Sequence, residues 1–390
     1  MTTPEKVSPG FAATAAPARL VDTPGAFDSL VRELGTPPLL AVDTEAASFH
    51  RYHDRVYLLQ LSTRELTAVV DPLTVTDLTP LARLLGEPAV EVVFHDADYD
   101  LRILDRDYGF RAARLFDTRI AAQFVNEPGI GLAALLEKYL GVRLDKKFQR
   151  ADWSIRPLSQ GMLDYAAADT RYLPQLRDIL RARLDELGRL EWAEEEFELL
   201  ERVRWTGSTT PEEAYLRLKG AKTLRGRSLL VLREVYNWRE DAAGRADRAT
   251  FRIMNPETVL AIGKAAPRTL ETLRGIPGMT PDQVNRRGAE ILAAVERGLA
   301  LPDSEIPVFE RGRRPAPDPA FDARLERLKA ARNAAAERLA LAPGVLCPNG
   351  TLEAIARVEP KTPEQLRGVD GVRRWQVEAL GKDLLTASAA

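Results

Sequence analysis

Two carboxylates, Asp43 and Glu45, stand at the end of the apolar run Leu39–Val42. Four apolar residues in a row predict a buried strand, and alternate side chains of a strand point to the same face. Asp43 and Glu45 should therefore lie side by side. Because adjacent anions repel each other, the pair favours a bound cation, and hard divalent ions prefer oxygen ligands of this kind. Two solvated acids at an exposed strand end would give the same pattern.

Two further segments carry acids that could join this pair. Asp100 lies in His95–Leu104, where a predicted strand passes into a helix, and it sits next to the apolar stripe of that helix. Leu163–Leu173 is an alanine-rich helix in which Tyr165 and Asp169 are one turn apart and share a face. A half-buried Tyr that is hydrogen-bonded to an Asp is the structural alternative for this last segment.

A basic stretch lies between the second and third acidic segments. Cations with an interleaved aromatic are typical of contact with the phosphates and bases of a single strand. An ordinary basic loop around a packed Trp is the alternative. The candidate residues for substrate binding are Lys146, Lys147, Gln149, Arg150, Trp153 and Arg156.

The elements that must position these residues form an α/β pattern. A helix is expected over 23–34, and the carboxylate strand is followed by two closely connected strands, which predicts an antiparallel pair. Strands then alternate with helices, and a single helical run is expected over 180–204. This order predicts a mixed five-stranded sheet flanked by helices. The further strands are expected at 56–61, 67–71, 90–95 and 114–118, with helices at 78–85 and from residue 98.

Length and composition limit the class of protein. A chain of 390 residues is too long for one ordinary domain. The single cysteine, Cys347, excludes internal disulfides and Cys-cluster zinc sites and suits a reducing cytoplasm. No apolar run has the length of a membrane span, so no membrane partner is expected. Residues 1–20 are rich in Pro, Ala and Thr and predict a disordered tail.

The second half of the chain contains an internal repeat. The segment Pro267–Gly278 recurs as Pro360–Gly371, an offset of 93 residues. Both copies carry Leu-Arg-Gly-x-x-Gly between two helices, which predicts a tight turn. The expected domains are a first domain over 21–205, a helical domain over 210–300, a linker over 301–319 and a second helical domain over 320–390.

The three acidic segments together resemble the ribonuclease D branch of the DEDDy family of 3′→5′ exonucleases. The matching segments occur in the family's order over about residues 24–205, and they are VDTE, HDADYDLRIL, FDT, KKFQRADWSIRPL and LDYAAADTRYL. The resemblance implies an RNase H-like sheet and two divalent metal ions, Mg²⁺ or Mn²⁺. It also implies metal ligands at Asp43, Glu45, Asp100 and Asp169, with Asp43 bridging both ions and Tyr165 orienting the attacking water.

The sequence departs from the family pattern at two places. Ala46 and Ala47 follow the first acidic pair, where the family often has a bulky residue. The family pattern therefore does not predict how the substrate packs near the scissile end. Asp96 and Asp98 add acids next to Asp100, where small or neutral residues are common. The alignment of Tyr99-Asp100-Leu101 favours Asp100 as the ligand.

The two helical copies resemble HRDC domains. From residue 207 to residue 297 the first copy has 16 Lys and Arg against 11 Asp and Glu, a net charge of about +5. Five of these cations are close together ahead of the repeated part: Arg217, Lys219, Lys222, Arg225 and Arg227. Local positive charge on a chain of net charge −2 predicts that this copy holds nucleic acid. The second copy is less basic, and a structural role is expected for it.

These features predict a cytoplasmic, monomeric, metal-dependent 3′→5′ exoribonuclease that acts on the 3′ ends of structured RNA such as tRNA precursors. A 3′→5′ exonuclease acting on DNA is an alternative, because carboxylates and a phenol do not read the 2′-hydroxyl. A non-catalytic RNA-binding scaffold with a decayed nuclease domain is a second alternative. The presence of all five expected site residues argues against decay.

Overall fold

A computed structural model describes residues 17–207, 211–307 and 318–389. Most of the expected N-terminal tail and part of the expected linker lie outside these ranges. The described residues of Met1–Glu45, Val56–Trp205 and Arg314–Ala390 form one compact unit, here called the sheet unit. Those of Ala46–Arg55 and Thr206–Arg313 form a second one, the helical unit. The second helical copy thus belongs with the sheet, a grouping that the sequence alone did not suggest.

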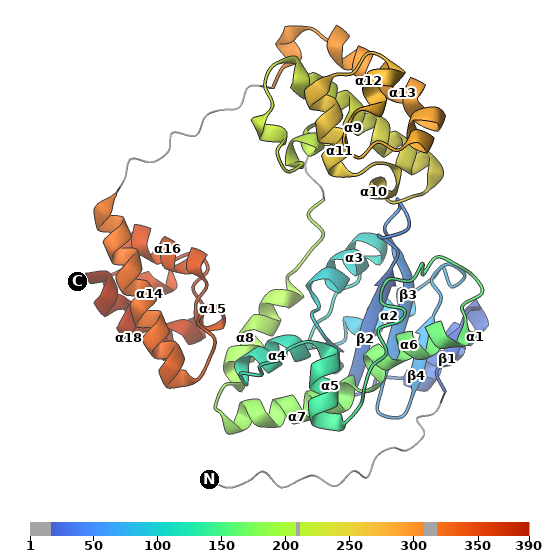
Figure 1. The fold of residues 1–390 in the computed structure, drawn as a ribbon. Coiled ribbons are helices and arrows are strands. Elements are labelled where there is room, and N and C mark those ends of the chain that lie inside the picture. Colours follow the sequence, from blue (N-terminus) through green and yellow to red (C-terminus); the bar gives the residue numbers. More distant parts are fainter. Residues whose placement is uncertain (1–16, 208–210, 308–317, 390) are drawn as a thin grey trace. The chain divides into compact units, whose positions relative to one another are not determined.

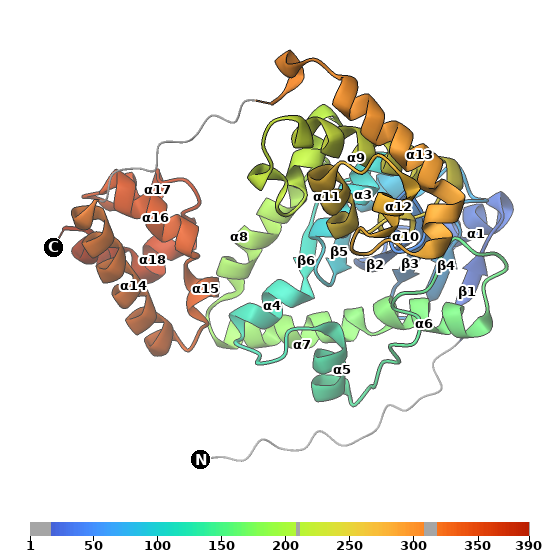
Figure 2. The same cartoon turned by 45° about the horizontal axis from the view of Figure 1, so that its top comes forward.

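The sheet unit contains a mixed six-stranded sheet in the order β1-β4-β3-β2-β5-β6 (Figures 1 and 2). The strands β3 and β4 pair antiparallel, as expected, and β2 pairs parallel with β5, as does β5 with β6. The mixed α/β class is confirmed. The bounds are β1 Arg19–Val21, β2 Leu39–Ala46, β3 Val56–Ser62, β4 Thr67–Val70, β5 Glu91–Phe94 and β6 Leu115–Asp117.

One strand was not expected. The strand β1 lies largely in the segment predicted to be a disordered tail, and it pairs parallel with Ala68–Val70 of β4. Its three residues are too few to show a period in the sequence. Its place in the sheet depends on pairing with a strand nearly 50 positions away along the chain, and the local sequence pattern does not indicate such a partner.

The sheet is covered on both faces, so its strands are buried almost continuously rather than alternately. All seven residues of β3 are buried, as are the first four of β2. The helices α6 and α7 contact β3, β4 and β5. The helices of this part are α1 Pro24–Leu34, α2 Thr79–Leu85, α3 Asp98–Tyr108, α4 Thr118–Phe124, α5 Leu132–Leu140, α6 Gln160–Arg171, α7 Leu173–Glu186 and α8 Leu190–Glu201.

The expected single helix over 180–204 is wrong. The structure has two helices, α7 and α8, separated at Gly188, whose φ of 64° lies in the left-handed region that a helix interior does not allow. Helical periodicity continues across the break because both helices bury an apolar face. The start of α1 is as expected, since the hydroxyl of Thr23 accepts a hydrogen bond from the Ala26 amide.

The second helical copy packs on α8 within the sheet unit (Figures 1 and 2). Its helices are α14 Pro319–Leu339, α15 Pro343–Leu346, α16 Asn349–Val358, α17 Pro363–Arg367 and α18 Arg374–Ala389. The ring of Trp375 stacks on Trp192 at 5.1 Å between centroids, and it meets Phe124 edge-on at 5.2 Å. Glu195 and Glu196 accept hydrogen bonds from Arg373, Arg374 and Trp375.

The helical unit holds the first copy, and its helices correspond to those of the second copy at the offset of 93. They are α9 Arg227–Ala246, α10 Thr250–Ile253, α11 Pro256–Ala265, α12 Leu270–Arg274 and α13 Pro281–Ala300. The turn glycines Gly278 and Gly371 both have positive φ, 86° and 80°. A Cβ on Gly278 would lie 2.1 Å from the hydroxyl oxygen of Thr258, so the close packing of this turn requires glycine.

The residues directly after the carboxylate strand pack within the helical unit. The carboxylate of Asp247 accepts from the amides of Tyr52 and His53, and the guanidinium of Arg252 donates to the Phe49 carbonyl. The rings of Phe49 and Phe251 meet edge-on. The segment after Ala46 and Ala47 is therefore held by the first helical copy rather than by the sheet.

Candidate active site

Three carboxylates from two distant segments meet at one place. Asp43 and Glu45, from β2, and Asp169, from α6, each offer an oxygen atom, and these atoms lie within 4.8 Å of one another. Asp43 and Glu45 share a face of β2, as strand alternation predicts. All three are half-buried. The geometry suits a cation bound between a strand end and a helix.

The helix α6 reaches this position because small residues line its inner face and a side-chain hydrogen bond joins it to the sheet. Ala166 and Ala167 are fully buried, so the helix backbone approaches the sheet closely. The hydroxyls of Thr170 and Ser62 are 2.8 Å apart in the interior and join α6 to β3 directly beside Asp169. Ser159 caps the start of the helix by accepting from the Met162 amide.

Asp100 lies beside the cluster of three. It is in the first turn of α3 and is 8% exposed, and one of its oxygens accepts a hydrogen bond from the Thr44 hydroxyl on β2. Asp96 and Asp98 are instead paired with Arg119 and Arg102. The geometry thus favours Asp100 among the three acids of this segment.

Burial raises the pKa values of all four acids, and the charges of neighbouring site acids add to this at Asp43 and Glu45. Burial is the largest cause for Asp43, whose pKa is well above its usual range, followed by the charges of Asp100, Asp169 and Glu45. The pKa of Glu45 is raised for the same reasons. Burial raises the pKa of Asp100 and that of Asp169 to about 7. A set of carboxylates that destabilise one another is the donor set that a hard divalent cation stabilises.

Tyr165 faces the same group of charges from α6. Burial is the main cause that raises its pKa, and the negative charges of Asp169, Glu45 and Asp43 add to it. The phenol is therefore protonated at neutral pH. It can orient a water molecule by hydrogen bonding, but it is a poor base.

The basic stretch divides into exposed and structural residues. The side chains of Lys146, Gln149 and Arg150 are exposed. Trp153 is only 1% exposed, so the prediction that it stacks on a base of the substrate does not fit its position. The guanidinium of Arg156 donates to buried Asp71 and to the carbonyls of Tyr57 and Trp153, so it holds the fold rather than a phosphate.

Two residues near the acids were not identified from the sequence. Thr44 lies between Asp43 and Glu45 and orients Asp100 through its hydroxyl, a contact between positions 56 residues apart. Asp117 accepts from the amides of Ala97 and Ile120, which fixes the starts of α3 and α4. The position of Asp117 at a strand end before a helix is a capping signal that could have indicated this role.

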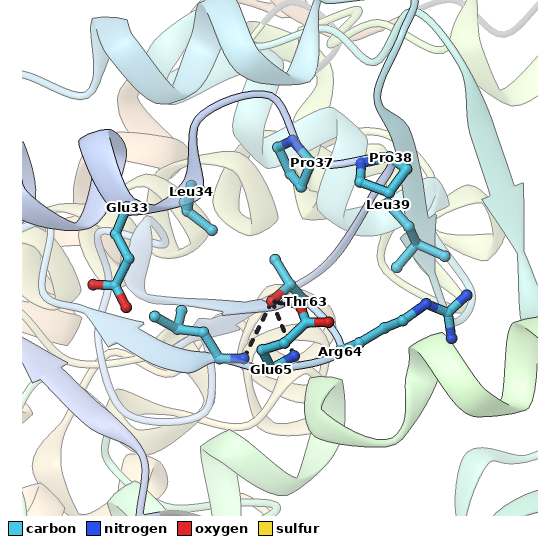
Figure 3. A pocket seen from close by; sticks show the side chains of 9 residues that line it. Glu33, Leu34, Pro37, Pro38, Leu39, Thr63, Arg64 and Glu65 are labelled. Carbon is cyan, nitrogen blue, oxygen red and sulfur yellow. Dashed lines mark hydrogen bonds between the residues drawn. The ribbon is translucent and has the colours of Figure 1, made fainter.

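A separate hollow of about 320 Å³ lies at the opposite end of β2 (Figure 3). It is lined by Glu33, Leu34, Pro37, Pro38, Leu39, Thr63, Arg64, Glu65 and Leu66. Leu39 is the first residue of β2, whereas the carboxylates are at its far end. None of the acids discussed above lines this hollow.

Comparison with known proteins identifies the family. Ribonuclease D of Granulibacter bethesdensis is 32% identical over 363 residues, which cover 92% of this chain and 89% of that protein. Ribonuclease D of Escherichia coli is 31% identical over 290 residues, which cover 74% of this chain and 77% of that protein. The chain belongs to the ribonuclease D family. The family resemblance seen in the acidic segments is confirmed.

The domain matches agree with membership of the ribonuclease D family. Residues 18–185 match the 3′–5′ exonuclease model, and residues 228–295 and 321–387 match the HRDC domain model. The crystal structure of Escherichia coli RNase D, described as an exoribonuclease involved in structured RNA processing, has a TM-score of 0.70 at 26% identity. The match covers 95% of this chain and 98% of the Escherichia coli chain. A structure from Bifidobacterium adolescentis has a TM-score of 0.81 at 25% identity over 95% and 97% of the two chains.

None of the helices in the described part of the chain combines the length and the apolarity that crossing a bilayer requires.

Proposed function

We propose that Asp43, Glu45, Asp100 and Asp169 hold two Mg²⁺ or Mn²⁺ ions in the active site of this 3′→5′ exoribonuclease. The observation that carries the proposal is the convergence of mutually repelling carboxylates from β2, α3 and α6, three of them half-buried and Asp100 buried. Their oxygens are the ligand type that both ions prefer, and the described part of the chain places no Cys or His among them. Four carboxylates roughly neutralise two divalent ions.

The roles of the side chains follow from their positions. When bound, the two ions would activate a water molecule and stabilise charge on the leaving 3′ oxygen. Asp43 has all three other acids among the causes of its raised pKa, so it is the candidate to bridge both ions. Tyr165 keeps its proton and orients the attacking water through its hydroxyl. Thr44 fixes the orientation of Asp100.

The substrate class we propose is RNA with a single-stranded 3′ end on a structured body, such as a tRNA precursor. The exposed cations of the stretch at 146–150 and the net positive charge of the first helical copy support contact with phosphates. The Escherichia coli relative is described as acting in structured RNA processing. We further propose that the protein acts as a monomer in the cytoplasm, where such RNA is processed.

A degradation assay tests this function. A hairpin RNA with a 3′ overhang, labelled at its 5′ end, should be shortened stepwise from the 3′ end with Mg²⁺ or Mn²⁺ and remain intact with EDTA. A DNA strand of the same sequence, added as competitor, should inhibit less than the unlabelled RNA does. Absence of shortening with either ion, in protein that is folded by circular dichroism, would contradict the proposal.

A further inference from the structure

Two aromatic rings of the loop at 145–157 pack against the ring of Tyr165. The ring of Trp153 lies 5.9 Å from that of Tyr165 between centroids, tilted by 34°. The ring of Phe148 meets Tyr165 edge-on at 6.2 Å. Both distances lie in the range of attractive aromatic pairs. The phenol is thus bounded by two aromatic rings from a single loop.

Phe148 is held along the face of α6 that carries Tyr165. A Cβ placed on Gly161 would lie 3.2 Å from the ring of Phe148, so the ring sits directly on the helix at this glycine. Gly161 and Tyr165 are four residues apart and occupy the same helix face. The glycine therefore makes room for the ring that contacts Tyr165 one turn later.

Arg156 holds the backbone at Trp153. One guanidinium nitrogen donates to the Trp153 carbonyl at 2.7 Å, and the other nitrogens reach the buried carboxylate of Asp71 and the Tyr57 carbonyl on β3. Trp153 is among the largest fully buried side chains of the described residues. Its indole N–H has no hydrogen-bond partner among those residues. The side chain is therefore held there by the packing of its ring, not by its polar atom.

We propose that Trp153 and Phe148 are positioning residues that act through Tyr165, and that Arg156 anchors Trp153 to the sheet. Rotation about the Cα–Cβ bond of a half-buried tyrosine would move the phenol oxygen, and the packing of two rings against Tyr165 opposes this rotation. This inference rests on the proposed role of Tyr165 in orienting water. It assigns the aromatic of the basic stretch to the chemical step and not to the binding of a base.

A double-mutant cycle tests the inference. W153F keeps an apolar ring and removes an unpaired N–H, and F148A truncates a half-buried ring. If one of these variants does not fold, the other still tests the inference. Each should lower kcat for a short single-stranded RNA about tenfold and leave KM and Mn²⁺ binding unchanged. In a Y165F background each should lower kcat less than twofold, because the group they position is already absent. I155A changes a side chain of the same loop that is 53% exposed and serves as the control, with no expected effect.

Three results would overturn the inference. The first is an equal loss of kcat in the wild-type and Y165F backgrounds, which would indicate a structural effect. The second is a higher KM with unchanged kcat, as expected if Trp153 or Phe148 stacks on a base. The third is an active enzyme in which Y165F has no effect. A wild-type protein that degrades no RNA would instead contradict the proposed function itself and remove its basis.

Discussion

At the residue scale, the raised pKa values of the site acids predict that these groups destabilise the metal-free protein at neutral pH. D43N should reduce the rate of RNA degradation by at least about 1,000-fold, equivalent to about 4 kcal/mol of transition-state stabilisation. It should also raise the melting temperature in EDTA, because an Asn cannot ionise beside the other three acids. D98N is the matched control, since Asp98 is exposed and paired with Arg102. A D43N variant with more than a tenth of the wild-type rate would disprove its assigned role.

The same charges predict a pH dependence of stability. Burial raises the pKa of Asp100 and that of Asp169 to about 7 in the folded protein, whereas the pKa of a carboxyl in an unfolded chain is near 4. Because the folded state holds these protons more tightly, the free energy of unfolding of metal-free protein falls as pH rises from about 4 to about 7. Urea unfolding in EDTA at several pH values measures this, and D169N should reduce the slope. Saturating Mn²⁺ should flatten it, and a rise of metal-free stability across this range would count against the assignment.

Several site residues could be predicted from sequence because their relations are local. The alternation of a strand places Asp43 and Glu45 on one face, and one helical turn places Tyr165 and Asp169 together. The contact of Thr44 with Asp100 joins positions 56 residues apart, so no local pattern indicates it. Trp153 shows a different limit: an aromatic among cations has the same pattern whether it stacks on a base or packs inside the protein.

At the scale of elements, the second helical copy is predicted to brace α8. W375A removes stacking on Trp192, the edge contact with Phe124 and a hydrogen bond to Glu196. It should lower the free energy of unfolding by about 3–5 kcal/mol, as measured by urea titration. W205A, at a tryptophan that is 43% exposed, should cost less than about 1 kcal/mol. Equal losses in the two variants would show that this contact does not support the fold.

The elements themselves were largely predictable where they are long and periodic. The helices at 23–34 and 78–85 and the buried strands follow from apolar pattern and caps. The strand β1 has three residues and depends on a distant partner, so it carries no period of its own. The break at Gly188 separates two helices that both bury an apolar stripe, and only the backbone conformation distinguishes them from one.

At the scale of the whole molecule, the first helical copy is predicted to hold the body of the RNA. All five clustered cations are exposed, but Arg225 and Arg227 donate to backbone carbonyls, so Arg217, Lys219 and Lys222 are the ones to change. Changing the first three to Glu should raise KM for a tRNA precursor at least about tenfold and reduce the dependence of KM on salt. The value of kcat for a short single-stranded RNA should not change.

The repeat offers a matched control for this experiment. Arg357, Lys361 and Arg367 are exposed cations of the second copy, for which we predict a structural role. Changing these three to Glu alters the net charge of the chain by the same amount. A similar rise in KM from both triple variants would mean that net charge, and not the surface of the first copy, determines the affinity for RNA.

The central claim is that carboxylates from three segments hold a pair of divalent ions, and anomalous scattering from crystals soaked in Mn²⁺ with a bound nucleotide tests it most directly. Two manganese peaks should lie about 4 Å apart, both within bonding distance of oxygens from Asp43, Glu45, Asp100 and Asp169. Peaks at other acids, or none at these four in nucleotide-bound crystals, would contradict it.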